Sequence, residues 1–246
     1  MQNPNPALVA AQITGLKRAG HKVAVVTNDG AADNYASALG QQEFVSATVE
    51  KLLQMPITRA WAKSIRVGVE GVSERLRNAV GKPVTNDDLS SLTLRAWANG
   101  VGVRWFFIAG LPGETDEDWI ELRGLVDSIR YATKGVVMAN FHAFIPQPAT
   151  PLCVLPLKDE YWERFEEFRR WFFHGPGFTR RMQIVAPAQY KGRMARACES
   201  MAATEGELRR GWAKDDAPNW RVKYLLTPDQ MRSIAVKYME RLTCPP

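Results

Sequence analysis

The chain has 246 residues, of which 46% are hydrophobic and 24% charged, and its formal net charge is +6. A chain of this length and apolar content can bury a substantial core, which excludes a wholly disordered protein. Its most apolar runs, Val101–Gly113 and Gly135–Pro148, are too short or too interrupted to span a bilayer. The first residues show no signal-peptide pattern, so we expect a cytoplasmic protein without a membrane partner.

Strand-type and helix-type runs alternate over residues 1–150. This alternation favours an α/β fold with a parallel sheet, barrel-like or doubly wound, that binds ligands at the carboxyl ends of its strands. Between Asn28 and Ser64 we expect one helix and no strand, so that about four strands of a six-strand core can be assigned. The expected strands are Lys22–Asn28, Ser64–Glu70, Val101–Ala109 and Gly135–Ile145, and the expected helices are Ala7–Gly20, Gln41–Leu53, Thr85–Asn99 and Thr115–Tyr131.

Prolines and basic residues become frequent after residue 150. Helices are expected over Asp159–Phe173, Pro187–Arg210 and Pro228–Leu242. We therefore divide the chain into an α/β part, residues 1–150, and a helical, basic extension, residues 151–246. Eight basic and three acidic residues lie in Gly177–Lys214. Such a segment attracts an anionic partner, for example nucleic acid, or it forms an ordinary solvated helix face.

Three segments carry motifs in a fixed order. They are GVEGVSERLRNAVGKPVTNDDL from Gly68, FFIAGLPGETDEDW from Phe106 and FHAFIPQPATPL from Phe141. Together they resemble the radical S-adenosylmethionine (SAM) superfamily, in particular the members associated with a cobalamin-binding domain. The resemblance implies a partial parallel (β/α) barrel of the radical SAM type, followed by the helical C-terminal extension. It also implies reductive cleavage of SAM to a radical that removes hydrogen from a substrate.

Glu70, Ile108, Gly110 and Leu111 are candidate SAM-binding residues at the ends of two expected strands. A carboxylate at the end of a strand can accept hydrogen bonds from ribose hydroxyls, and a glycine lets a ligand approach the backbone. In similar proteins these positions contact the ribose and the adenine. The alternative for Glu70 is a surface ion pair with Arg75 or Lys82, and the alternative for Gly110 is a tight turn.

Two further candidates follow from the same resemblance. Asp29 lies after the first expected strand, where similar proteins hold the SAM amino group, and Asn28-Asp29-Gly30 is equally a common turn. His142 lies on the fourth expected strand, near the expected edge of the adenine, and its alternative is a packed, hydrogen-bonded histidine. Glu114 and Thr115 are expected first of all to cap the helix that follows them.

The cysteines do not supply the iron–sulfur site that the resemblance implies. A [4Fe–4S] cluster needs closely spaced thiolates, and the family uses a Cys-x-x-x-Cys-x-x-Cys loop. Cys153, Cys198 and Cys244 are too far apart for this loop, so we expect no metal ligated by this chain. The sequence therefore predicts a SAM-binding portion that begins past the cluster loop and is inactive alone. It would need an upstream cluster-bearing polypeptide or self-association, either of which could also cover the strand edge at Lys22–Asn28.

Two other functions remain open. The chain could be a degenerate, non-catalytic scaffold that binds an anionic partner, nucleic acid or protein, through Gly177–Lys214. It could also be an unrelated α/β enzyme, although it contains no P-loop, Gly-x-Ser-x-Gly elbow, His-Glu-x-x-His or Gly-x-Gly-x-x-Gly motif after a strand.

Overall fold

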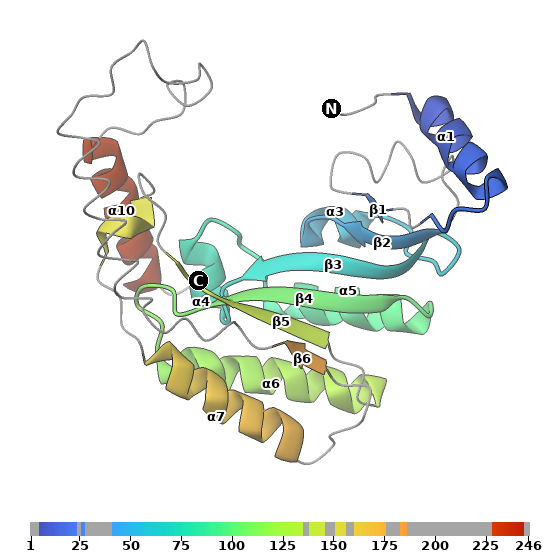
Figure 1. Ribbon diagram of the computed structural model, residues 1–246. Helices are drawn as coiled ribbons and strands as arrows, with labels where there is room; N and C mark the ends of the chain where they lie inside the picture. Colours follow the sequence, from blue (N-terminus) through green and yellow to red (C-terminus); the bar gives the residue numbers. More distant parts are fainter. Residues whose placement is uncertain are drawn as a thin grey trace, which may run out of the picture.

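Six parallel strands form one sheet in which the spatial order follows the order of the sequence (Figure 1). This computed structural model describes residues 5–23, 26–27, 41–134, 138–145, 151–155, 160–175, 183–185 and 228–243. The parallel α/β class expected from the sequence is confirmed. The strands are β1 (Val26–Thr27), β2 (Gln42–Ser46), β3 (Ala62–Glu70), β4 (Gly102–Ala109), β5 (Met138–Ala143) and β6 (Gln183–Val185).

The helices that connect the strands cover a single face of the sheet. Parallel crossovers are right-handed, so strands added always in the same direction place every connecting helix on the same side. Contacts of α5 with α3 and α6, and of α6 with α7, form that layer. The sheet is therefore wound in one direction, as in a partial β/α fold. The helical elements are α1 (Pro6–Arg18), α3 (Val49–Gln54), α4 (Glu74–Ala79), α5 (Asn86–Ala98), α6 (Asp116–Thr133), the 3-10 turn η1 (Pro151–Val154), α7 (Tyr161–His174) and α10 (Pro228–Thr243).

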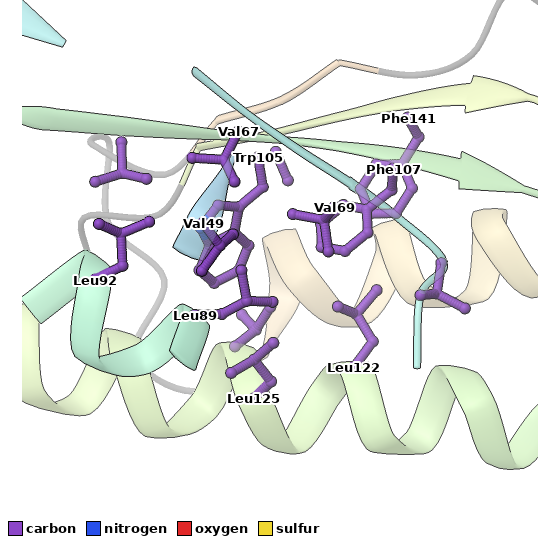
Figure 2. Packing of buried hydrophobic residues seen from close by; sticks show 14 of the residues in the cluster. Val49, Val67, Val69, Leu89, Leu92, Trp105, Phe107, Leu122, Leu125 and Phe141 are labelled. Carbon is purple, nitrogen blue, oxygen red and sulfur yellow. The ribbon is translucent and has the colours of Figure 1, made fainter. Parts of the chain in front are cut away.

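Alternation along β4 separates the two faces of the sheet. Val103, Trp105 and Phe107 are buried against the helices, while the residues between them are half-buried on the other face. Figure 2 shows the buried side chains pointing from the strands toward Leu89 of α5 and Leu122 of α6. Successive side chains of a strand point to opposite faces, so the sheet has a face covered by helices and a second face. We call this second face the open face, because its described residues on β3, β4 and β5 are half-buried or exposed.

Residues 41–54 correct one expectation. The sequence predicted a single helix over Gln41–Leu53, whereas the structure has strand β2 and then helix α3. The Thr48 side chain accepts a hydrogen bond from the backbone N–H of Lys51, which fixes the start of α3 there. The expectation of no strand between Asn28 and Ser64 was therefore wrong.

Elements beyond residue 150 share the sheet and core of the earlier part. Strand β6 pairs with β5, and Phe165, Phe168 and Phe172 of α7 are fully buried in the same hydrophobic cluster as Phe141. Helix α10 packs on α4 and η1. The helix expected over Pro187–Arg210 lies outside the described residues, as does Gly177–Lys214 except for β6. No helix in the described ranges is both long and apolar enough to cross a membrane.

Candidate functional site

The carboxyl end of β3 presents Glu70 on the open face. The backbone of Glu70 has a φ of +69°, and the pairing with β4 shifts by one residue between Gly68 and Glu70. This irregularity brings the Glu70 carboxylate back over Gly68, where Oε1 lies 3.0 Å from the position that a Cβ of residue 68 would occupy. A glycine at position 68 therefore leaves the room that the carboxylate occupies.

Lys82, from the loop between α4 and α5, forms an ion pair with Glu70. Both side chains are partly exposed, at 46% for Lys82 and 26% for Glu70. The pairing with Lys82 that the sequence analysis gave as an alternative is thus present. A solvent-accessible pair of this kind contributes little to stability, so the carboxylate can exchange its lysine partner for a ligand at small cost.

Ile108 and His142 complete the open face next to Glu70. They are register partners on β4 and β5, and Glu70 pairs with Phe107, one residue before Ile108. The ring of His142 lies nearly parallel to that of Phe106, with ring centroids 6.1 Å apart and an interplanar angle of 7°. The edge of the open face therefore offers a carboxylate, an aliphatic side chain and a pair of aromatic rings within three adjacent strands.

A cleft of 550 Å³ opens beside this edge. Its walls come from the carboxyl end of β2, from Arg66 and Gly68 of β3, from Phe106 of β4 and from residues 81–84, which include Lys82. A volume of this size is in the range of sites for nucleotides and other cofactors.

The turn after β4 is held by a buried carboxyl group. Gly110, with a φ of +80°, donates its backbone N–H to Glu114 Oε2 at 2.7 Å, and the indole N–H of Trp119 donates to Oε1 at 3.0 Å. Burial raises the pKa of Glu114 to about 7, although both hydrogen bonds act in the opposite direction. Leu111 is buried in the core, so its side chain is not available to a ligand.

Helix α10 packs against the same turn. The Tyr238 hydroxyl is buried and donates to the carbonyl of Pro112 at 2.6 Å, and burial raises its pKa. Leu242 lies against Gly113. A Cβ added to Gly113 would lie 2.6 Å from the Cδ1 atom of Leu242. Arg75 joins these parts, since it donates to the carboxylate of Asp118 and to the carbonyls of Gly113 and Leu242.

Asp118 also fixes the start of α6. Its carboxylate accepts hydrogen bonds from the backbone N–H and the hydroxyl of Thr115, and from the Ser73 hydroxyl at 2.6 Å. Thr115 thus occupies the N-cap position of α6, with Asp118 bonded back to it, whereas Glu114 serves the turn rather than the helix end.

Of the six candidate binding residues, five are described. Glu70, Ile108 and His142 come together on the open face, while Gly110 and Leu111 lie in the turn beyond β4. Asp29 lies outside the described residues, as do Cys198 and Cys244. In the part of the chain that the structure describes, no three His, Cys, Asp or Glu side chains gather in a way that could hold a metal ion.

Three open-face residues escaped the sequence analysis, namely Phe106, Arg66 and Arg104. Their position on the open face could have been predicted from the alternation in SIRVGVE and GVRWFFIA, where every second residue is buried. Because the buried apolar residues face the helices, the residues between them must point to the other side of the sheet.

Comparison with known proteins adds one partial relative. A scan against known protein families finds no match for this chain. An uncharacterized protein of Methanocaldococcus jannaschii is 33% identical over 89 residues, which is 36% of this chain. The chain spans about a fifth of the length of that relative, whose alignment covers 20% of it. This similarity assigns no activity.

Proposed function

We propose that the chain is the SAM-binding portion of a radical SAM-type protein and that SAM binds along the open face at the carboxyl ends of β3, β4 and β5. The observation that carries the proposal is the meeting of Glu70, Ile108 and His142 on three adjacent parallel strands. These three residues come from the three segments that carry the resemblance. In the sequence, α4 and α5 lie between Glu70 and Ile108, and α6 lies between Ile108 and His142.

The chemistry of these side chains fits the parts of SAM. The Glu70 carboxylate can accept hydrogen bonds from the two ribose hydroxyls, with Lys82 as its partner when no ligand is bound. The flat rings of Phe106 and His142 and the side chain of Ile108 offer an apolar surface to a purine. If an external donor reduced and cleaved it, bound SAM would supply hydrogen-atom abstraction. The protein would bind and orient SAM and limit the access of water.

An iron–sulfur cluster does not fit the described residues, because no group of possible metal ligands gathers among them. Cys153, in η1, is the one cysteine within the described ranges. We therefore assign no reaction step to a cluster in this chain. The proposal leaves that part to a partner polypeptide, or to a second copy that contributes ligands.

Titration calorimetry with SAM tests the proposal. We expect the wild-type chain to bind SAM and Glu70→Gln to bind it about tenfold more weakly, because one charge-assisted acceptor is lost. Glu43→Gln is a matched control, since Glu43 forms a similar exposed ion pair with Lys63, 2.7 Å long, at the other end of the sheet. No binding by the wild type, or equal weakening in both variants, would contradict the proposal.

A further inference from the structure

Two arginines lie side by side on the open face, and no acidic partner for them is found among the described residues. Arg66 of β3 and Arg104 of β4 are register partners and are both half-buried. Within the described ranges, neither forms a hydrogen bond or ion pair with a carboxylate. Other partly buried arginines do have such partners, for example Arg75 with Asp118 at 2.6 Å and Arg164 with Glu160 at 3.1 Å.

This pair is unfavourable for the fold on its own. Like charges directly opposite one another on adjacent strands destabilise a sheet. Burial, and then the charge of Arg104, lower the pKa of Arg66, which is the direction expected for a cation that lacks a counter-charge. The structure thus holds two positive charges next to each other on adjacent strands, and a local conflict of this kind is typical of functional sites.

The surroundings of the pair suit a small oxyanion. The Arg66 guanidinium lies over the ring of Phe44, 3.3 Å from its centroid, which orients the planar group. Ser46 is the register partner of Arg66 on β2, and both residues line the 550 Å³ cleft. A guanidinium has the donor geometry that matches carboxylate and phosphate oxygens.

We propose that Arg66 and Arg104 together bind the carboxylate or phosphate group of a substrate. Assigning this oxyanion to a substrate rests on the proposed function. Ile108 lies four positions after Arg104 along β4, a distance of about 13 Å at the rise of a strand. The substrate is thus an anionic molecule whose charged end is held by Arg66, at the wall of the cleft, and by the neighbouring Arg104. Its other end extends toward the carboxyl edge, where SAM is proposed to bind.

The test uses inorganic phosphate and succinate as probes. The melting temperature of the whole chain is followed against the concentration of each probe, with sodium chloride keeping the ionic strength constant. An anion that binds the folded state raises the melting temperature, and the dependence on concentration yields its dissociation constant. We expect Arg66→Gln and Arg104→Gln each to weaken binding about tenfold, because one charge-assisted contact is lost.

Arg232→Gln is the matched control. Arg232 is an exposed arginine of α10 that pairs with Asp229 at 3.1 Å, so its replacement removes one charge away from the cleft. Its dissociation constants should stay within about twofold of the wild-type values, because distant exposed charges are screened. Failure of the wild type to bind either probe, or equal weakening by all three variants, would overturn the proposal. A melting temperature of Arg104→Gln well below that of the wild type without any probe would also overturn it, because the pair would then serve stability.

Repeating the titration with SAM separates this proposal from the proposed function. If phosphate or succinate still binds at saturating SAM, the oxyanion belongs to a second molecule, as we propose. If SAM abolishes probe binding, the arginines hold the carboxylate of SAM itself, and the assignment to a substrate is wrong. If the probes bind and SAM does not, the oxyanion site stands and the proposed function fails.

Discussion

The covered and open faces of the sheet are built from the same strands but obey different rules. On β4, Val103, Trp105 and Phe107 face the helices and are buried, whereas Arg104 and Phe106 face the cleft side and are half-buried. The covered face therefore stabilises the fold. The open face carries charges and rings that contribute less to stability, and this is where we expect ligands.

The largest expected effect tests this division directly. Phe141→Ala removes a fully buried ring whose centroid lies 5.1 Å from that of Phe107 and 5.3 Å from that of Phe165. We expect a loss of about 3–5 kcal/mol in the free energy of unfolding, measured with urea. Phe106→Ala, on the open face, should cost about 1 kcal/mol, because that ring is half-buried and, among the described residues, stacks on His142 alone. Equal losses would mean that the two faces do not differ in this way.

The next effect concerns the buried carboxyl group behind the β4 turn. The pKa of Glu114 is raised from 4.5 to about 7, so its contribution to stability is complete below pH 4.5 and is lost as the pH rises through 7. The loss amounts to about 3 kcal/mol by linkage. Urea unfolding at a series of pH values should show this decline in the wild type and a much flatter profile in Glu114→Gln. A parallel profile in the variant would assign the pH dependence to other groups.

A smaller effect tests the contact of α10 with the same turn. Gly113→Ala places a Cβ at a residue with a φ of +77° and within 2.6 Å of Leu242. We expect a loss of about 1–2 kcal/mol in the free energy of unfolding, because a side chain is strained in this conformation. Gly124→Ala is the matched control, since Gly124 lies in α6 with open space around it and alanine there should stabilise the helix slightly. If Gly124→Ala lost stability and Gly113→Ala did not, the role given to the contact between Gly113 and Leu242 would be contradicted.

The smallest effect returns to the open face. Removing Arg104 relieves its repulsion with Arg66, so Arg104→Gln should be more stable than the wild type by about 0.5 kcal/mol at low salt. Salt screens repulsion between partly exposed charges, so this advantage should decline as sodium chloride is added. Unfolding in urea at low and high salt measures the difference. An advantage that grows with salt would show that repulsion is not its source.

Most long elements could be predicted from the sequence. The strands that become β3, β4 and β5 contain continuous apolar or alternating runs, and α5 and α6 begin at clear capping residues. Strand β2 was missed because Phe44, Val45, Val49 and Leu52 can be fitted to one helical pattern, and only Thr48 marks the break. Strand β6 has three residues, too few for any periodicity to be visible.

The candidate site was predictable only in part. Residues at strand ends, such as Glu70 and Ile108, could be named because parallel strands place their carboxyl ends together. The partners of these residues could not be ranked, because Lys82 and Arg75 are both near Glu70 in sequence and only the fold directs Arg75 to Asp118 instead. Arg66 and Arg104 are 38 positions apart, and their adjacency depends on the register of two strands.

The contacts of α10 also have a consequence for the order of folding. Tyr238 bonds to Pro112 across 126 positions of the chain, and Arg75 to Leu242 across 167. Contacts between such distant positions form slowly, and during synthesis the amino-terminal portions fold first. The loop that follows β4 therefore gains its contacts with α10 only after residue 242 has emerged from the ribosome.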